Sequence, residues 1–406
     1  MGYRNRTLAS LLLLALVVGA FLAGYGYGQG RAAAGADADS QGFALVRDVL
    51  RHIRHTYLVP QADTTKVFHG AARGMLEALD DPYSRFMDAD AYKEFRTELS
   101  GVFYGVGIFV ELQDGRPVVL QPIPGTPAHR EGLRPGDRIL AVDGVATDRM
   151  SLEEVVSRIR GPSGTTVTLR LTRGDRTFQV PLVRTRITNV SVQGDQFLTD
   201  EIRAQLRDAG VAYIRVTRFE DPTAREFGKA LDAAINAGAR GLLLDLRSNV
   251  GGLLHVSVEV ADRFVPPGEP IVHRLDRDGR RQTERASRRA KVSLPVVVLV
   301  NEYTASAGEI VAGALADHEI APLVGVRTFG KGVIQSILAL PGGTGATLTS
   351  GKYLTPDGHD IHGKGIAPNV AVGERLAGRT DAEIRQIEAA QFARALDLLK
   401  QRINRR

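Results

Sequence analysis

The chain of 406 residues contains no cysteine. This absence excludes disulfide bonds, a cysteine nucleophile, cysteine-ligated zinc and a lipoprotein anchor, and it is compatible with an oxidising compartment without proving one. A nucleic-acid recognition motif is also missing, and no aromatic residues alternate with the basic ones, so the formal net charge of +6 does not indicate nucleic-acid binding. The basic termini are better explained as solubilising charge, with attraction of the N-terminus to anionic lipid head groups as the alternative.

Several catalytic signatures are missing as well. The sequence has neither a G-x-S-x-G nucleophile elbow nor an H-E-x-x-H zinc motif, and its glycine spacing fits neither nucleotide-binding fingerprint. His359 and His362 form an H-x-x-H pair, but glycines follow and no third ligand is evident. We therefore interpret these histidines as structural or substrate-lining residues and expect no metal site.

The N-terminus carries the parts of an export signal. Arg4 and Arg6 precede an apolar run from Leu8 to about Ala23, and small residues follow. This order is typical of a secretory signal, although the run is also near the lower length for spanning a bilayer, and we favour retention as an anchor. We predict a signal peptide or membrane anchor over residues 1–29, membrane contact through it, a flexible tether over residues 30–42, and export of the remainder to the periplasmic or extracytoplasmic face.

The pattern of apolar residues divides the remaining chain into four regions. Residues 43–100 show helical periodicity, and residues 101–185 read as short alternating strands with glycine turns and one helix from Ser151 to Ile159. In residues 186–375 fully apolar strands alternate with helices, which predicts a sheet covered by helices. Residues 376–406 form a closing amphipathic helix and a basic tail. The sequence thus predicts a multidomain α+β protein without internal repeats.

The small β module opens with the loop Gly105-Val106-Gly107-Ile108, inside a segment that we predict as one strand from Val102 to Leu112. Glycines on both sides of an apolar residue let successive backbone N–H groups point into one concavity, which suits a carboxylate. The following strand offers an edge with which an incoming peptide can pair. Alone, the pattern is better explained as a glycine-rich strand start.

Downstream glycine motifs change that interpretation. Three of them follow in order: Gly125–Ala128, Gly132–Asp137 and Ile139–Gly144. The succession closely resembles the PDZ domains of bacterial proteases, which capture protein C-termini. The resemblance implies a peptide groove between the strand after Gly107 and the Ser151–Ile159 helix, with the Gly105–Ile108 loop at the terminal carboxylate. It also suggests Arg160, at the end of that helix, as a sensor of PDZ occupancy.

A serine stands where an apolar strand meets an amphipathic helix, in the segment from Val300 to Ile310 (VNEYTASAGEI). Ser306 would lie where the first helical N–H groups are unpaired and the helix dipole is positive, and those groups can stabilise the oxyanion of an acyl transfer. A helix N-cap is an equally good explanation for a serine at such a junction.

A serine nucleophile needs a base, and no histidine has a diagnostic setting. Lys331 stands between two glycines at the end of a predicted buried strand (TFGKGVIQ), where burial lowers the pKa of an ammonium group. Gln335 has the same strand parity, so its amide could orient the amine. Taken in isolation, such a lysine would be interpreted as a solvated surface charge.

A third segment, Asp245 to Leu254 (DLRSNVGGLL), runs from an apolar strand through a double glycine into a helix. Such a turn can present backbone N–H groups to an oxyanion. As a bare pattern it is equally consistent with a phosphate loop.

Together these three segments strongly resemble the carboxyl-terminal processing, or tail-specific, serine peptidases, which share the double-glycine loop, V-N-x-x-[ST]-A-S-A-x-E and T-F-G-K-G-x-x-Q in this order. The resemblance implies a ClpP/crotonase-like α/β peptidase core and catalysis without a cofactor. It implies Ser306 as the nucleophile, Lys331 as the general base and Gln335 as the partner that orients the base. The amide of Ala307 and one amide from Gly251–Gly252 would form the oxyanion hole.

The resemblance extends over about residues 43–369 and has departures. Tyr303 and Thr304 stand where Gly and Ser are common, Gly308 replaces a common serine, and Ser248–Val250 replaces N-N-P. None of these departures removes a reacting group, but Tyr303 would narrow the site.

The leading hypothesis is an exported serine endopeptidase that cleaves proteins near their C-termini, which its PDZ module recognises. The resemblance also implies protein substrates bound by their C-terminal tails, regulation by PDZ position, an activating adaptor protein, and homo-oligomers formed through the N-terminal helices. One rival is a catalytically inert PDZ scaffold of the cell envelope, which the joint presence of Ser306, Lys331 and Gln335 disfavours. Another is a crotonase-like acyl-CoA enzyme, which the export signal and the peptide-binding module disfavour.

Overall fold

The computed structural model describes residues 39–59, 63–99, 102–113, 115–123, 125–148, 150–188, 190–287 and 292–405. The predicted signal or anchor over residues 1–29 and most of the predicted tether lie outside these ranges. The chain divides into two compact units, Met1–Phe86 and Met87–Arg406. No helix among the described residues is both long and apolar enough to cross a membrane.

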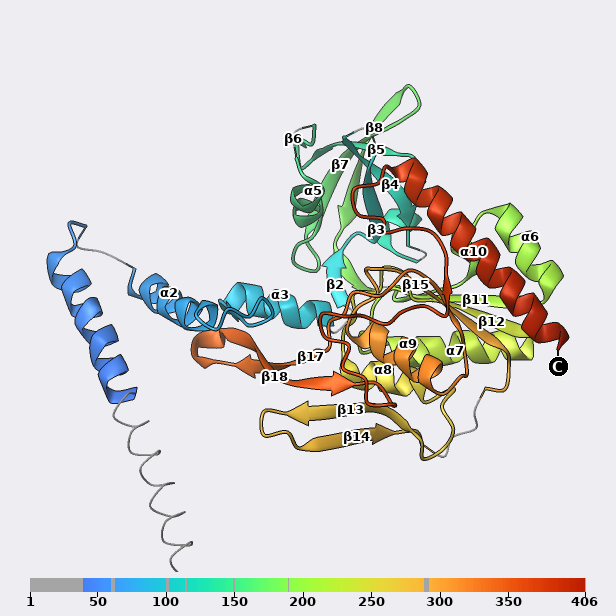
Figure 1. Cartoon of the computed structure of the whole chain (residues 1–406). Coiled ribbons are helices and arrows are strands. Elements are labelled where there is room, and N and C mark those ends of the chain that lie inside the picture. Colours follow the sequence, from blue (N-terminus) through green and yellow to red (C-terminus); the bar gives the residue numbers. More distant parts are fainter. Residues whose placement is uncertain are drawn as a thin grey trace, which may run out of the picture. The chain divides into compact units, whose positions relative to one another are not determined.

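Two helices make up most of the described part of the first unit (Figure 1). One spans residues 39–56, and α2 spans Thr64–Glu77. Asp63 caps α2, because its Oδ1 atom accepts hydrogen bonds from the backbone amides of Thr65 and Lys66. No side chain of α2 is buried, and the large apolar side chains of the helix over residues 39–56 are also largely exposed. Helices therefore form in the region where apolar periodicity predicts them, and most of their large apolar side chains are exposed to solvent.

An antiparallel β module follows β1 (Arg85–Met87) and α3 (Ala89–Leu99) along the chain. Its elements are β2 (Val102–Gly105), β3 (Ile108–Gln113), β4 (Arg116–Pro122), α4 (Pro127–Arg130), β5 (Arg138–Val142), β6 (Val145–Ala146), α5 (Leu152–Ile159), β7 (Thr166–Arg173), β8 (Arg176–Val183) and β9 (Thr185–Thr188). The sheet has the order β3-β4-β5-β7-β8, β6 pairs with β5, and β2 pairs with β9. A capping box between Ser151 and Glu154 begins α5, whose Val155 belongs to the buried core of the module.

The single strand predicted from Val102 to Leu112 is wrong, because the segment is broken into β2 and β3. The break falls at Gly107, where φ is +79° and a Cβ atom would lie 2.3 Å from the side chain of Thr126. The Thr126 hydroxyl donates a hydrogen bond to the Gly107 carbonyl at 3.1 Å. Both the positive φ and this close approach require glycine, and they turn the chain out of the strand.

A larger sheet and five helices form the core of the second unit. The strands are β10 (Val192–Gln193), β11 (Val211–Val216), β12 (Gly241–Asp245), β15 (Val296–Val300), β16 (Leu323–Gly325) and β19 (Val370–Ala371). They follow this same order in space and are parallel, except that β10 is antiparallel to β11. The helices are α6 (Asp200–Ala209), α7 (Thr223–Asn236), α8 (Leu254–Ala261), α9 (Ala307–Asp317) and α10 (Asp381–Asn404).

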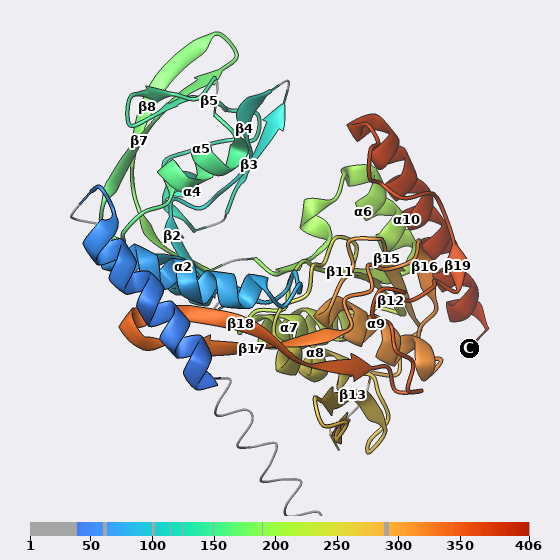
Figure 2. The same cartoon turned by 60° about the vertical axis from the view of Figure 1, so that its left-hand side comes forward.

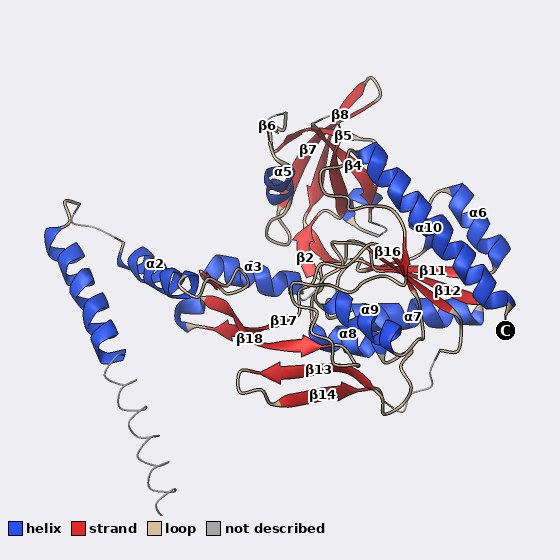
Figure 3. Ribbon diagram, viewed as in Figure 1, coloured by secondary structure: helices blue, strands red, loops and turns tan. Residues whose placement is uncertain are grey.

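Helices cover both faces of this sheet (Figure 3). Leu242 and Leu244 of β12 belong to the core beneath α7, α8 and α9, whereas Leu243 belongs to the core beneath α6 and α10. Because successive side chains of a strand point to opposite faces, a fully apolar strand can serve two cores. The predicted α/β peptidase core, with apolar strands covered by helices, is confirmed.

A smaller antiparallel sheet contains β13 (Pro270–Asp276), β14 (Arg281–Arg285), β17 (Val333–Ala339) and β18 (Gly345–Leu354). The strand β18 pairs with β17, beside which it lies in Figure 2, and also with β13. The strand β13 pairs in turn with β14. The hairpin of β13 and β14 was not predicted, because β14 reads Arg-Gln-Thr-Glu-Arg and has no apolar residue to mark a buried face. This sheet positions the segment around Lys331, which directly precedes β17.

Candidate active site

Ser306 lies at the junction between the buried strand β15 and the helix α9, as predicted. It occupies the N-cap position of α9 with φ 54° and ψ −118°, angles that residues other than glycine rarely adopt. Its side chain is partly exposed, whereas Ala305 and Ala307 on either side are buried. Strained backbone of this kind persists where surrounding contacts hold it, and it concentrates at functional sites.

A buried carboxylate connects the serine segment to the lysine segment. The Oε2 atom of Glu309 accepts hydrogen bonds from the backbone amides of both Ser306 and Lys331, each at 2.9 Å. Its Oε1 atom accepts from the Gly330 amide at 2.7 Å and from the Thr328 hydroxyl at 2.6 Å. Burial raises the pKa of Glu309 above its usual value, and the four hydrogen bonds oppose that rise. One side chain therefore holds the main chains of both predicted catalytic residues.

A tyrosine hydroxyl joins the same two residues through their carbonyl groups. The hydroxyl of Tyr353, a buried residue of β18, lies 2.9 Å from the Ser306 carbonyl oxygen and 2.5 Å from that of Lys331. The amides of Ser306 and Lys331 thus meet at one oxygen atom, and their carbonyls meet at another. This arrangement brings the main chains of the two residues together, although they stand 25 positions apart in the sequence.

Neither Glu309 nor Tyr353 was predicted as a site residue. The pattern Ser306-x-x-Glu309 matches a capping box, in which the fourth residue accepts a hydrogen bond from the amide of the first, so this signal could have found Glu309. Tyr353 lies on another strand, and nothing in its local sequence indicates a contact with Ser306.

Lys331 lies in the loop before β17 and is partly buried. Gln335 lies on β17, and its amide nitrogen donates to the Thr349 hydroxyl at 3.3 Å. Because Lys331 lies in the loop before β17, strand parity does not show that its side chain and that of Gln335 share a direction. The orienting role of Gln335 stays a prediction.

The double-glycine loop lies against the serine. A Cβ atom at Gly251, where φ is +101°, would lie 2.7 Å from Ser306 Cβ and 3.1 Å from the Ala307 nitrogen. The Gly251 amide donates to the side-chain oxygen of Asn249 at 2.9 Å, and Gly252 follows with φ +139°. The Ala307 amide belongs to the first turn of α9, whose N–H groups have no intrahelical partner. The structure thus brings the predicted oxyanion residues close to Ser306.

An exposed apolar side chain stands in each of the three converging segments. Val250, Tyr303 and Phe329 are 58%, 41% and 51% exposed. The Phe329 amide donates to the Thr304 carbonyl at 3.0 Å, so the segments that carry Tyr303 and Phe329 are neighbours. We call Val250, Tyr303 and Phe329 the apolar rim.

The predicted carboxylate-binding loop, Gly105 to Ile108, is buried except for the partly exposed Ile108. Its carbonyl groups are fixed inside the module, since Val106 accepts from the Ala128 amide and Gly107 accepts from the Ile123 amide, each at 2.9 Å. Arg160, at the C-cap of α5, is exposed. Together with residues of α5 it lines a groove of about 660 Å³.

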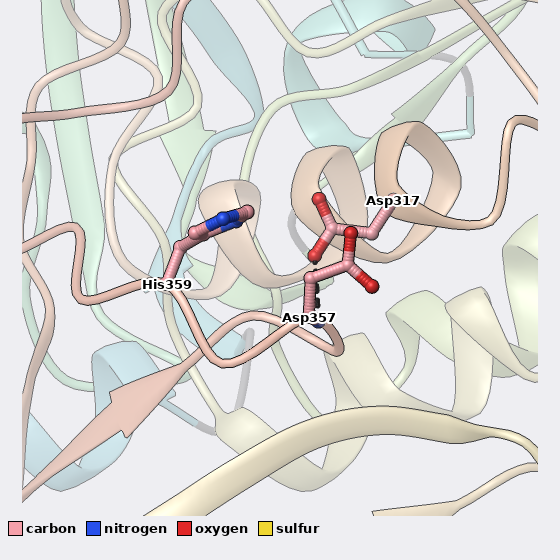
Figure 4. Close-up of side chains that lie close together, drawn as sticks. All are labelled: Asp317, Asp357 and His359. Atoms are coloured by element: carbon pink, nitrogen blue, oxygen red, sulfur yellow. Dashed lines mark hydrogen bonds between the residues drawn. The ribbon is translucent and has the colours of Figure 1, made fainter.

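One group of possible cation ligands lies among the described residues outside these segments, at the end of α9 (Figure 4). Asp317, Asp357 and His359 each offer a ligand atom, and these atoms lie within 4.8 Å of one another. The Asp357 amide donates to Asp317 Oδ2 at 2.9 Å, which ties the turn after β18 to the end of α9. Asp357 and His359 are exposed, and exposed acidic groups commonly gather without a metal. The cluster is therefore explained by its structural contact.

Comparison with known protein families accounts for most of the chain. The profile of peptidase family S41 matches residues 210–372, which contain the serine, lysine and double-glycine segments. A PDZ domain profile matches residues 118–173, and the profile of the N-terminal domain of the activating protease CtpB matches residues 28–91.

Individual relatives agree with these profiles. The chain is 37% identical to a carboxyl-terminal-processing protease of Synechocystis over 354 residues, which cover 86% of this chain and 80% of the relative. It is also 37% identical to the carboxy-terminal processing protease CtpA of Bacillus subtilis over 312 residues, 76% of this chain but only 65% of the relative. A crystal structure from Bacteroides fragilis assigned to the S41 proteases shares the fold, with a TM-score of 0.55, 16% identity, and coverage of 88% of this chain and 97% of that one. The chain belongs to peptidase family S41, among the carboxyl-terminal processing proteases with an embedded PDZ domain.

Proposed function

We propose that this chain is a serine endopeptidase that cleaves exported proteins near their C-termini, with Ser306 as nucleophile and Lys331 as general base. One observation carries the proposal: the amides of Ser306 and Lys331 share Glu309 Oε2, and their carbonyls share the Tyr353 hydroxyl. Without these shared contacts, Ser306 would be interpreted as a helix cap and Lys331 as a solvated surface charge. With their main chains bound to the same two side chains, the long lysine side chain can bring its amine to the serine hydroxyl.

The reaction is acyl transfer. The neutral amine of Lys331 takes the proton of the Ser306 hydroxyl as Oγ attacks the scissile carbonyl carbon, and it returns the proton to the leaving amine. Water, activated by the same amine, then hydrolyses the acyl-enzyme. The oxyanion accepts hydrogen bonds from the Ala307 amide at the positive end of α9 and from the Gly252 amide, because the Gly251 amide already donates to Asn249. Gln335 orients the amine of Lys331.

Substrate selection rests on the PDZ module and the apolar rim. The Gly105–Ile108 loop binds the free C-terminal carboxylate, and the substrate chain pairs with β3. The position of β3 at the end of its sheet supports this, since an edge strand has backbone groups with which a peptide can pair. Arg160 relays occupancy of the module to the active site. The rim offers apolar contacts to the substrate beside Ser306.

Location and assembly are part of the same proposal. The basic and apolar N-terminus directs export and anchors the chain at the outer face of the cytoplasmic membrane. The match to the CtpB N-terminal domain and the exposed apolar side chains of the first unit support a homo-oligomer formed through those helices. An activating adaptor protein would act on the same assembly.

A serine-reactive fluorophosphonate tests the nucleophile and the base. Wild-type protein should be labelled, Ser306→Ala should not be, and Lys331→Ala should lose both labelling and proteolysis while its circular dichroism is unchanged. Undiminished proteolysis by Lys331→Ala would exclude Lys331 as the base. If wild type is neither labelled nor active, the chain is better explained as an inert PDZ scaffold.

The carboxylate-binding role is tested with two peptides that differ only in their C-terminus. Amidation removes the negative charge that the Gly105–Ile108 loop is proposed to bind, so the amidated peptide should be cleaved more slowly. Equal rates for the free and amidated peptides would count against the loop.

A further inference from the structure

The C-terminal part of the chain contacts both loops that carry catalytic groups. We name residues 372–391, from the end of β19 to the third turn of α10, the C-terminal segment. The oxyanion loop is residues 245–252, and the nucleophile loop is residues 301–306. The contacts below show that each loop is bound to the C-terminal segment by a buried polar side chain.

Arg247 connects the oxyanion loop to α10. Its guanidinium pairs with the fully buried Asp245 at 2.7 Å, and its Nη1 atom donates to the Glu388 carbonyl at 3.0 Å and to the side-chain oxygen of Gln391 at 3.3 Å. Gln391, which is 1% exposed, donates in turn to the Val372 carbonyl at 3.2 Å. Although burial opposes it, the charge of Arg247 holds the pKa of Asp245 below its usual value. The loop is thus bound to α10 by two hydrogen bonds from a guanidinium whose charge is paired within the loop.

Glu302 connects the nucleophile loop to the same segment. Its Oε1 atom accepts hydrogen bonds from the backbone amides of Leu376 and Ala377. The side chain is 2% exposed, and its other oxygen, Oε2, is buried without a hydrogen-bond partner among the described residues. A half-satisfied buried carboxylate is costly, so the two hydrogen bonds to the C-terminal segment come with a penalty in folding stability.

The two loops are also bound to each other. The side-chain oxygen of Asn301 accepts from the Ser248 amide at 2.8 Å, and its nitrogen donates to the Ser248 hydroxyl at 3.1 Å. The Ala305 amide donates to the Asn249 carbonyl at 2.8 Å. Ser248 and Ser306 have φ values of 59° and 54°, so each loop contains a residue that would relax away from this conformation without outside contacts.

We propose that Arg247, Glu302 and Gln391 are positioning residues, through which the docked C-terminal segment holds both loops in the geometry that acyl transfer needs. This inference rests on the proposed function, because it concerns the same acyl-transfer site. A displacement of about 1 Å at the Gly252 amide or at Ser306 weakens interactions made in the transition state. Substrate binding by the PDZ module, which contains neither loop, is not affected. The expected signature is therefore a loss of kcat that is much larger than any change in KM.

The test measures kcat and KM of the full chain on an internally quenched peptide with a free C-terminal carboxylate, with active sites counted by fluorophosphonate labelling. Gln391→Leu removes an acceptor of Arg247, and Glu302→Met removes the acceptor of two amides. Each should lower kcat about 10- to 100-fold and keep KM within about twofold. Glu302→Gln retains an oxygen for both amides and should restore most of kcat.

Two controls separate positioning from stability. Gln386→Leu makes the same change at an exposed glutamine of α10 and should leave kcat unchanged. Leu399→Ala removes a buried side chain two turns further along α10, so it should lower the melting temperature but leave kcat per labelled site unchanged.

The outcomes decide between the two roles. If Gln391→Leu lowers only the melting temperature, as Leu399→Ala does, its role is structural and the proposal is wrong. The proposal is also wrong if Glu302→Met and Glu302→Gln have equal activity. If Gln391→Leu does not fold, the comparison of these two Glu302 variants alone tests the proposal. Wild-type protein that neither cleaves nor labels at Ser306 overturns the proposed function and this inference together. Active wild type with unaffected variants overturns the inference alone.

Discussion

Glu309 accepts four hydrogen bonds with its two buried oxygens, and a Glu309→Leu variant would leave all four donors without a partner. A buried donor that loses its partner costs about 1–3 kcal/mol, so four cost about 4–12 kcal/mol if water does not reach them. This range overlaps the whole stability of an ordinary domain, about 5–15 kcal/mol. Opening the segments around Ser306 and Lys331 to water is then cheaper than keeping the donors buried. We expect this variant to lose labelling at Ser306 before it loses its fold.

Glu309→Gln is the matched variant, because it keeps the shape and one carbonyl oxygen. That oxygen can retain the amides of Ser306 and Lys331, while the new amide nitrogen faces Thr328 and Gly330. The Thr328 hydroxyl can rotate and accept from it, which leaves only the Gly330 amide unpaired. The free energy of unfolding should therefore fall by about 1–3 kcal/mol, the cost of one unpaired donor, and labelling of Ser306 should persist.

Urea unfolding and the rate of fluorophosphonate labelling measure the two effects separately. The expected order is wild type, Glu309→Gln and Glu309→Leu in both measurements, with the large step in labelling between the last two. Equal destabilisation by the two variants, or a leucine variant labelled at the wild-type rate, would refute the role assigned to the four hydrogen bonds.

Three further predictions concern neighbouring contacts. Tyr353→Phe should lower the free energy of unfolding by about 0.5–1.5 kcal/mol and slow labelling of Ser306, and an unchanged labelling rate would contradict the bridging role of the hydroxyl. Gly252→Ala would place a Cβ atom 2.0 Å from the Phe219 carbonyl oxygen, so labelling should be lost, whereas Gly358→Ala, which has a positive φ but open space, should retain it. Burial lowers the pKa of His273, so this residue contributes stability above about pH 6.5 that is lost as the pH falls through its folded pKa. His273→Gln should therefore flatten the decline in melting temperature between about pH 7 and pH 5, and a wild-type slope would show that another group causes it.

Residues whose role depends on their place along the chain could be predicted from the sequence. Ser306 follows an apolar strand and precedes an amphipathic helix, and the structure places it at that junction. The turn at Gly251–Gly252 follows β12 and could be predicted from the chain, but its oxyanion role came from the family resemblance, because the bare pattern is equally consistent with a phosphate loop. In each case local physics, namely buried strand, turn and helix start, determines where the backbone groups point.

Residues whose role depends on contacts between distant segments could not be predicted in this way. Tyr353 reaches Ser306 only because β18 pairs with β17, and Gln391 reaches Arg247 only because α10 covers one face of the larger sheet. Strand parity does not decide the direction of the Gln335 side chain relative to Lys331, because Lys331 lies in the loop before β17. Such positions require the tertiary structure, since their own neighbours in sequence carry no sign of the contact.

The two side chains that bridge Ser306 and Lys331 contact the main chains of these residues. Glu309 and Tyr353 bind only backbone amides and carbonyls of the two residues, so neither bridge uses the serine hydroxyl or the lysine amine. A lysine side chain has a flexible four-carbon stem and loses much conformational entropy when its amine is held in one position. Because the main chain of Lys331 is already fixed, only the side chain has to be ordered to place the amine. The two bridges come from different elements, α9 and β18. A shift of β18 relative to α9 would therefore break the Tyr353 bridge, while Glu309 would still hold the amides of Ser306 and Lys331.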